Sequence, residues 1–456
     1  MLKSLRALLA GAVCMSGSAA LAQLPGPDVT YQNITSTFNY GLVGDTRAYA
    51  FSSDTCNIGT QNLRWGGSWQ GSPSLAMNLY RIAGGTMTQI GMSWCKQACC
   101  AAAGSGCGTC NGTGGTYLGV GCKDVYGASY NGGQSRLAPR SAHNAWTGAM
   151  TLAPTTTGDA IFKRLQVDNK DVDPATVGAI YIGEGVYVAN DDAPAGNHFN
   201  NSSWKRMNLD PTNRNLNPTG AMSIGEPAIY AWRALGGPGG TLDPSVNIYP
   251  VNIPDEGRVY LAAKVTQRPN GTYLYSYAIF NLNSDRSIGS IALPFSGNAS
   301  ISDVGQSLPK YHSGEPYLNV GWTMSRANGT LKWATPHTFE QNANTSALRW
   351  GTMYNYWFVS NAPPRMDGTV TLGVFKPHTA PSVTVSGVAV PGPVCGTADF
   401  DRDGDLGTDS DITAFYRCIA GDCCATCQTA DFNDDGDIAT DADIEAFFRV
   451  MAGGAC

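Results

Sequence analysis

One aspartate-rich segment occurs twice near the end of this 456-residue chain. Residues 399–411 read DFDRDGDLGTDSD, and residues 431–443 read DFNDDGDIATDAD. In both copies, carboxylate or amide side chains occupy alternate positions around one shared glycine, Gly404 or Gly436. Such a pattern offers several oxygen atoms to a hard cation and lets the backbone turn sharply between them. The duplicated segment therefore restricts the C-terminal region to a fold built around two similar loops, each suited to Ca²⁺.

The spacing within each copy predicts which side chains coordinate the two Ca²⁺ ions. In an EF-hand loop the ligands come from positions 1, 3, 5, 7, 9 and 12, with glycine at position 6. The final acid of each copy falls one position late, and Asp409 or Asp441 just before it could share its role. The predicted metal ligands are Asp399, Asp401, Asp403, Asp405, Asp411, Asp431, Asn433, Asp435, Asp437 and Asp443.

Apolar residues at helical spacing follow each loop, and they predict a helix with one apolar face. They are Ile412, Phe415, Tyr416 and Ile419 after the first loop, and Ile444, Phe447, Phe448 and Met451 after the second. A loop followed by a helix, repeated once without an entering helix, resembles a dockerin, the calcium-dependent module that binds a cohesin domain. The segment is similar in particular to the dockerin variant of planctomycete secreted proteins (GC-type), which shares the Gly-Thr-Asp-x-Asp-Ile signature at residues 407–412, paired cysteines and a terminal Gly-Gly-x-Cys.

The resemblance covers residues 396–456 and implies two bound Ca²⁺ ions and a cohesin-like partner. A disordered acidic tail is disfavoured, because disorder gives no reason to repeat the glycine spacing and the helical spacing of aromatic residues. A calcium-binding staple that has no partner remains open. In either case, repulsion between the clustered carboxylates predicts that folding of the module depends on the metal.

The N-terminus predicts export. Lys3 and Arg6 precede an apolar run at residues 7–15, and Ala20-Leu21-Ala22 forms a small-residue cleavage site before Gln23. We therefore expect residues 1–22 to be a signal peptide and the protein to be secreted, either extracellular or at the cell surface. No later stretch approaches about 18 apolar residues, so no transmembrane segment is expected.

Short alternating patterns between turn residues predict a mainly β body of one or two β-sandwich domains. Asn270-Gly271 lies between two β-rich runs and predicts a hairpin. The body resembles uncharacterised secreted planctomycete β proteins, a resemblance that implies no activity. The expected organisation is a β-rich domain at residues 23–155 with a Cys-rich insertion at 94–122, a β-sandwich domain at 156–388, a Pro-rich linker at 389–395, and a small C-terminal α module of two calcium loop-helix repeats, the dockerin-like module, at 396–456.

Cysteine and charge are unevenly distributed. Seven cysteines lie between Cys56 and Cys122, and six lie between Cys395 and Cys456. In an exported chain we expect disulfides, so the even set could close into three bridges and the odd set leaves one thiol free or paired elsewhere. Residues 395–456 contain fourteen Asp and Glu against three Arg. The acidity therefore belongs to the tail, and no basic patch indicates a nucleic-acid partner.

No catalytic motif occurs in the body. Its histidines are isolated, without H-E-x-x-H spacing, and no G-x-S-x-G segment is present. Glycosidase chemistry needs two carboxylates about 5–10 Å apart, and the candidate acids are Asp124, Glu184, Asp191, Asp192, Glu226, Asp255 and Glu256. Two hypotheses remain: a binding or structural body carried by the module, with polysaccharide as one potential partner, or a polysaccharide-active hydrolase delivered by it. Whether the protein is an enzyme stays open.

Overall fold

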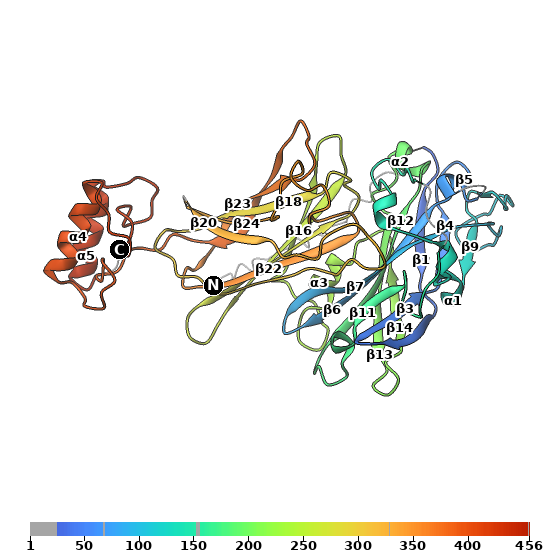
Figure 1. The fold of residues 1–456 in the computed structure, drawn as a ribbon, viewed down its shortest axis with the longest axis horizontal. Coiled ribbons are helices and arrows are strands. Elements are labelled where there is room, and N and C mark those ends of the chain that lie inside the picture. Colours follow the sequence, from blue (N-terminus) through green and yellow to red (C-terminus); the bar gives the residue numbers. More distant parts are fainter. Residues whose placement is uncertain (1–24, 67–68, 152–155, 328, 455) are drawn as a thin grey trace, which may run out of the picture.

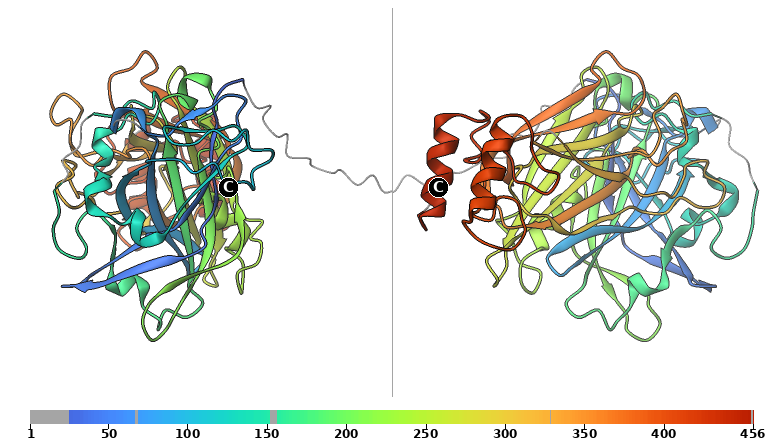
Figure 2. Two further views of the ribbon diagram at one scale, coloured as in Figure 1. Left: turned by 90° about the vertical axis from the view of Figure 1, so that its right-hand side faces the viewer. Right: turned by 60° about the vertical axis from the view of Figure 1, so that its left-hand side comes forward.

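The protein is mainly β, as the sequence predicts, in a computed structural model that describes residues 25–66, 69–151, 156–327, 329–454 and 456. Figure 1 shows two adjoining β units and, at the far end of the longest axis, a small helical module that carries the C-terminus. The right-hand view of Figure 2 shows the same helical pair lying outside the β body. The expected signal peptide, residues 1–22, lies outside the described residues.

The first unit is built on one large antiparallel sheet. Its strands are β2 (Thr37–Val43), β3 (Thr46–Phe51), β6 (Ser74–Ala83), β7 (Thr86–Gln97), β10 (Leu137–Ala138), β11 (Leu165–Asp168), β12 (Ile180–Val188), β13 (Ser202–Leu209) and β14 (Leu216–Ser223). The strand order is β14-β13-β12-β6-β7-β11-β3-β2, with β10 paired to β7.

Two smaller sheets and short helices complete this unit. The smaller sheets are β1 (Val29–Asn33), β4 (Ser53–Asn57) and β9 (Lys123–Tyr126) in the order β1-β4-β9, and the pair β5 (Leu63–Arg64) with β8 (Tyr117–Leu118). The α-helices are α1 (Ala128–Asn131), α2 (Asp192–Ala195) and α3 (Ile229–Leu235). The 3₁₀ helices are Trp69–Gly71, Gln134–Arg136, Arg140–Ala142 and Asn169–Val172.

The second unit is a sandwich of two five-stranded sheets. One contains β15 (Asn247–Asn252), β16 (Arg258–Gln267), β17 (Tyr273–Asn281), β22 (Thr352–Ser360) and β19 (Ser302–Ser307), in that order. The other contains β20 (Thr323–Ala327), β21 (Thr330–Ala334), β18 (Ile288–Pro294), β23 (Pro364–Val374) and β24 (Ser382–Pro391), in that order. Strands β16 and β17 form the hairpin predicted at Asn270-Gly271, with Gln267 opposite Tyr273.

The sheets are stacked so that the large sheet is covered on both faces. Side chains on one face, including Leu75 and Tyr187, pack against β1. Side chains on the other face, including Tyr80, pack against α3 and against residues of β16 and β17 such as Phe280. Because neighbouring residues of a strand point to opposite faces, this stacking buries all nine residues of β12.

The boundary expected between residues 155 and 156 is wrong. Strand β11 pairs with β3 and β7, and β12 pairs with β6 from Ile180 opposite Ile82 to Val188 opposite Ser74. The first unit therefore continues through β14, and the second begins with β15. The polar stretch of sequence near residue 155 does not mark a domain border here. Hydrogen bonding between strands far apart in sequence decides which sheet a strand joins.

The Cys-rich insertion begins later than the predicted residue 94. Trp94 and Cys95 belong to β7 inside the large sheet, so the irregular segment begins after Gln97. The predicted odd thiol is Cys95, which is buried and unpaired. The other upstream cysteines pair as Cys56–Cys107, Cys99–Cys100 and Cys110–Cys122, and the C-terminal six pair as Cys395–Cys456, Cys418–Cys423 and Cys424–Cys427.

The expected linker at 389–395 is shorter than predicted. Ala389 and Val390 are buried residues of β24, which ends at Pro391. Only residues 392–395 then separate the body from the helical module. In the described part of the chain, no helix is long and apolar enough to cross a membrane.

Candidate calcium-binding module

Two loop–helix units make up the C-terminal module. Their helices are α4 (Asp409–Ile419) and α5 (Asp441–Met451). Each begins with a capping box, in which the N-cap Thr408 or Thr440 accepts a hydrogen bond from a backbone N–H one turn later. These caps satisfy N–H groups that have no partner inside the helix, so the sequence Thr-Asp-x-Asp starts both helices at matching positions.

Four phenylalanines hold the two units together. Phe400, Phe415, Phe432 and Phe447 are fully buried, and the rings of Phe415 and Phe447 stack with centroids 4.1 Å apart. Phe400 and Phe432 occupy position 2 of the two loops, and the other two lie on the helices. Each unit alone would expose this face, so the duplicated sequence produces one shared core.

The two loops have the same backbone conformation. Position 4 has a positive φ in both, at 62° for Arg402 and 59° for Asp434. The position-6 glycines, Gly404 and Gly436, have φ values of 100° and 98°. Only glycine adopts the latter region without strain, which is the physical reason for the shared glycine that the sequence displays.

The first loop gathers the acids that the sequence predicts. One carboxylate oxygen from each of Asp399, Asp401 and Asp403 lies within 4.8 Å of the other two. The Oδ1 atom of Asp399 is buried and has no hydrogen-bond partner. Three carboxylates converging with an unsatisfied oxygen form a donor set that fits a hard, oxygen-binding cation.

The second loop differs in its hydrogen bonds, because both carboxylate oxygens of Asp431 accept from backbone N–H groups, those of Asp435 and Gly436, at 3.1 Å. Asn433 replaces the second acid, and its Oδ1 accepts a hydrogen bond from the Asp435 backbone N–H at 3.0 Å. Burial raises the pKa of Asp431, hydrogen bonding from the Gly436 backbone N–H opposes this, and the nearby carboxylates of Asp434 and Asp443 raise it further. Like charges therefore crowd this loop.

The last acid of each loop, Asp411 or Asp443, acts as a helix cap. Asp411 Oδ1 accepts from the backbone N–H groups of Phe400 and Asp401, and its Oδ2 accepts from the N–H and hydroxyl of Thr408. Asp443 makes the same four bonds to Phe432, Asn433 and Thr440. Both oxygens of each carboxylate are thus engaged, and the predicted role of these two acids as ligands stays a prediction.

Burial alone would raise the pKa of Asp411. The hydrogen bonds from Thr408, Asp401 and Phe400 outweigh burial and hold the pKa below its ordinary value. Asp405 and Asp437, at position 7, are exposed, and the N–H of Asp405 donates to Asp403 Oδ1 at 2.9 Å. Asp409 and Asp441 are exposed in the first turn of each helix.

The second loop of the module contacts both the body and the linker. The side-chain amide of Asn298, in the segment between β18 and β19, donates to the carbonyl oxygens of Asp431 and Phe432 at 3.4 Å. The Val394 N–H donates to Asp434 Oδ2 at 3.1 Å. The first loop takes part in none of these contacts.

Apart from the adjacent pair Asp191 and Asp192, the acids proposed for glycosidase chemistry have separate partners. Asp124 is buried and accepts from Trp65 Nε1, Glu226 accepts from Trp204 Nε1, and Glu256 accepts from Ser284. Glu184 is fully buried between strands, and Asp255 is exposed at a turn. Asp191 is the N-cap of α2, and Asp192 is its first residue. Five surface pockets occur in the described part of the chain at the places discussed below and elsewhere on the body, and none of these seven acids lines any of the five.

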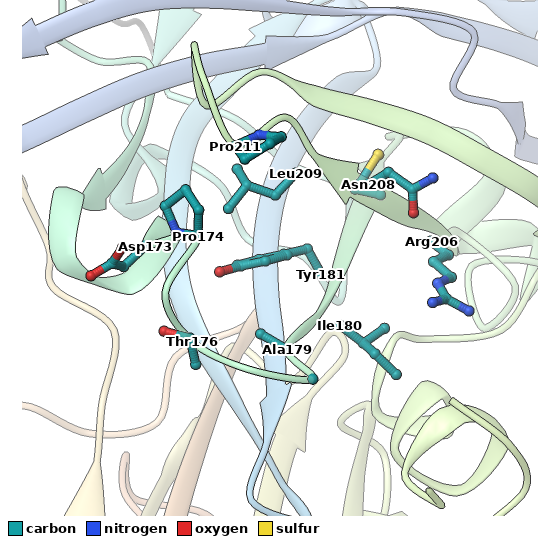
Figure 3. Close-up of a pocket in the computed structure, with 12 residues that line it drawn as sticks. Asp173, Pro174, Thr176, Ala179, Ile180, Tyr181, Arg206, Asn208, Leu209 and Pro211 are labelled. Atoms are coloured by element: carbon teal, nitrogen blue, oxygen red, sulfur yellow. The ribbon is translucent and has the colours of Figure 1, made fainter. Parts of the chain in front are cut away.

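One of these pockets, of about 440 Å³, lies at the edge of the large sheet near β12 and β13. Figure 3 shows the ring of Tyr181 at its centre, with Leu209 and Pro211 on one side and Thr176 and Ala179 on the other. Asp173 is the one acid that lines it, so this pocket does not hold the pair of carboxylates that glycosidase chemistry needs.

A cleft between the two β units of the body brings two other acids together. It has a volume of about 460 Å³ and receives Asp168 and Asp171 from the first unit and Lys310 and Trp357 from the second. Asp168 forms an ion pair with Lys310 at 2.7 Å, and Asp171 forms one with Arg81 at 3.3 Å. Sequence reasoning missed this cleft, because its residues come from distant segments and carry no motif.

Comparisons with known proteins leave the chain without a family. No family model and no curated protein sequence matches it. Among solved structures, the N-terminal domain of the Streptococcus gordonii adhesin Sgo0707 has 10% identity and a TM-score of 0.16, over 76% of this chain and 60% of that one. The Amycolatopsis orientalis exo-chitosanase CsxA has 8% identity and a TM-score of 0.14, over 74% of this chain and 25% of that one. These likenesses are too weak to assign a fold family or an activity.

Proposed function

We propose that this protein is a secreted docking protein whose C-terminal module binds two Ca²⁺ ions and attaches the β body to a cohesin-type partner. The observation that carries the proposal is the convergence of Asp399, Asp401 and Asp403 in a loop whose conformation is repeated in the second copy. The disulfides support an extracellular location, because such bonds persist in oxidising surroundings.

A duplicated apolar surface supports a docking role rather than a purely structural staple. Leu406 and Ile438, at position 8 of the loops, are 73% and 69% exposed. Tyr416 and Phe448, at equivalent positions of α4 and α5, are 46% and 41% exposed, and their ring centroids are 6.3 Å apart. Exposed apolar groups that recur in both copies are typical of a surface that a protein partner covers.

The metal requirement is tested by calcium titration of the chain stripped with EGTA. We expect far-UV circular dichroism to report helix formation on Ca²⁺ addition, with Asp399→Ala and Asp431→Ala each removing one bound ion from the module. Asp422→Ala is the matched control, because Asp422 is an exposed acid outside both loops that pairs with Arg417. An unchanged spectrum, with no ion bound at either loop, would refute the calcium proposal.

The docking role is tested by biolayer interferometry against a panel of purified cohesin domains. We expect binding in Ca²⁺ that is abolished by EGTA and weakened at least tenfold by the double change Tyr416→Ala and Phe448→Ala. Tyr117→Ala serves as the control, because Tyr117 is an exposed tyrosine of the first β unit, outside the C-terminal module. Calcium binding without binding to any cohesin would instead support the staple.

A second candidate function concerns the cleft between the units. The indole of Trp357 is partly exposed there and packs against Gly305 of β19, where an added Cβ would come within 2.2 Å of the ring. An aromatic face beside polar and charged side chains suits a sugar, so the cleft is the place where the body would bind a polysaccharide. Cations of the protein itself, Lys310 and Arg81, engage Asp168 and Asp171, which favours binding over hydrolysis.

A glycan array followed by a reducing-sugar assay separates the two readings of the cleft. Binding that is lost in Trp357→Ala, without sugar release, supports a binding body. Sugar release that is lost in both Asp168→Asn and Asp171→Asn supports the hydrolase. If the protein neither binds nor cleaves any glycan tested, polysaccharide is excluded as a partner.

A further inference from the structure

The second aspartate loop of the module, residues 431–443, lies against the turn of the body that follows β18. The side-chain amide of Asn298 in this turn donates to the backbone carbonyl oxygens of Asp431 and Phe432 at 3.4 Å. Thr429, just ahead of the loop, packs on Gly297, where an added Cβ would come 3.2 Å from the Thr429 Cγ2. The start of the loop is therefore held from the body side.

The turn that carries Asn298 is itself fixed to the sandwich. Arg326 of β20 donates from Nη2 to the carbonyl oxygens of Ser296 and Gly297 at 2.8 and 2.7 Å. Its guanidinium lies 4.7 Å from the ring centroid of Phe295, which is buried in the core of the sandwich. Asn298 thus reaches the module from a rigid support.

The linker holds the same loop from a second side. The side chain of Val394 packs against the core of the sandwich, and its carbonyl oxygen accepts from the Ser296 hydroxyl at 3.5 Å. Its N–H donates to Asp434 Oδ2 at 3.1 Å. Asp434 has the left-handed backbone conformation, with a φ of 59°, which is costly for a residue other than glycine. This hydrogen bond supports the loop at its most constrained residue.

These contacts use atoms that a calcium ion would leave free. In the EF-hand scheme the ion takes side-chain oxygens at positions 1, 3 and 5, which here belong to Asp431, Asn433 and Asp435. The body and linker take the backbone carbonyl oxygens at positions 1 and 2 and the side chain of Asp434 at position 4. An ion and the body can therefore hold the loop at the same time.

We infer that the second loop is a calcium-dependent joint, in which bound Ca²⁺ strengthens the contact between module and body. Both the ion and the body order the same short backbone, so ordering by one lowers the cost of binding the other. The coupling is reciprocal, and the body must raise the calcium affinity of this loop by the same factor.

This inference rests on the proposed function, because it requires that the second loop binds Ca²⁺. It goes further by making two similar loops unequal. The contacts of Asn298 and Val394 go to the second loop and not to the first, residues 399–411. The first loop should therefore bind Ca²⁺ without help from the body.

Calorimetric Ca²⁺ titration of the full chain, with one loop disabled at a time, tests the joint. In the Asp399→Ala chain, which keeps the second loop, we expect Asn298→Ala to weaken Ca²⁺ binding about fivefold or more. In the Asp431→Ala chain, which keeps the first loop, the same change should leave the affinity as it was. Asn217→Ala, at an exposed asparagine of β14, is the matched control and should alter neither affinity.

The possible failures are distinct. An unchanged affinity on adding Asn298→Ala to the Asp399→Ala chain, or an equal loss in both chains, overturns the joint while the calcium sites stand. Absence of Ca²⁺ binding in both single-loop chains refutes the proposed function, and the joint with it.

Small-angle X-ray scattering at saturating Ca²⁺ gives a second readout, the spread of distances between module and body. The Asp399→Ala chain should keep the narrow spread of the wild type, and the Asp431→Ala chain should show a broader one, with circular dichroism checking that their helices are equally formed. Equal spreads in the two variants overturn the joint.

Discussion

A single carboxylate can serve as a helix cap, as a metal ligand, or as both in turn. Asp411 and Asp443 occupy the position of the last EF-hand ligand relative to their helices, three residues after the N-cap. An aspartate is one methylene shorter than the glutamate usual there. In this fold the shorter side chain binds the N–H groups at the start of the loop and of the helix.

Two substitutions distinguish these roles. We expect Asp403→Asn to weaken Ca²⁺ binding while stability returns at saturating Ca²⁺. We expect Asp411→Asn to cost about 1–3 kcal/mol of unfolding free energy even at saturation, because buried N–H donors lose an acceptor. Urea unfolding of both variants across a Ca²⁺ series measures this. Full recovery of Asp411→Asn at high Ca²⁺ would identify Asp411 as a ligand.

A buried histidine gives the body a pH dependence. Burial lowers the pKa of His143 from 6.5 to about 4, the bond to the Pro139 carbonyl opposes this, and Arg140 lowers it further. As the pH falls from 6.5 towards 4, the unfolded chain takes up a proton that the native state refuses, so this residue contributes a loss of stability in that window.

The change His143→Gln removes that contribution. Between pH 6 and pH 4.5, the unfolding free energy of the wild type should fall more steeply than that of the variant, by up to about 1.4 kcal/mol per pH unit. Denaturant titrations at several pH values measure the two slopes. Parallel slopes would show that His143 titrates normally.

At the scale of elements, strand β12 depends on one buried acid. Glu184 accepts hydrogen bonds from Asn78 and Tyr80 on β6, from Ser202 on β13, and from the Ala228 N–H before α3. Burial raises the pKa of Glu184, and these hydrogen bonds oppose the rise. The side chain thus joins three strands and a helix inside the large sheet.

We expect Glu184→Ala to destabilise the body by about 3–5 kcal/mol, since it leaves several buried donors unsatisfied. Glu184→Gln should cost less, because it keeps the volume and one acceptor. Glu445→Ala, on the exposed face of α5, is the control and should change stability little. A small loss for Glu184→Ala in thermal or denaturant unfolding would contradict this role.

At the scale of the whole molecule, the two β units share a core. Trp232, Phe280 and Met353 lie in one cluster that both units line. Hydrogen bonds cross the junction as well: Arg140 Nη1 donates to the Gly351 carbonyl at 2.8 Å, and the Met353 N–H donates to Gln89 Oε1 at 2.7 Å. Separation would expose this cluster and leave buried polar groups unpaired.

The body should therefore unfold in a single calorimetric transition, apart from any transition of the C-terminal module. We expect Phe280→Ala to shift this one transition to lower temperature and to reduce the unfolding free energy of the whole body by about 3–5 kcal/mol. Two separate body transitions, only one of them sensitive to Phe280→Ala, would show that the units are independent.

Local patterns in the sequence predict much of this fold. The β class, the hairpin at Asn270-Gly271, and the two helices after the aspartate loops depend on residues close together in the chain, so alternation, turn chemistry and capping are sufficient to find them. The predicted domain border is wrong because it depends on pairing between strands that are far apart in the chain. The partners of β11 lie on β3 and β7, and no local pattern encodes such pairings.

The sequence by itself determined the module: the loop acids, the turn glycines and the helix caps all act within a dozen residues of one another. Tertiary structure alone decided the rest. It brought Asp168 and Asp171 into a cleft beside Trp357, and it placed the buried Asp192 beside Val29 of the first strand. These groups meet only after the sheets have stacked, because burial and hydrogen bonding across distant strands are properties of the folded chain.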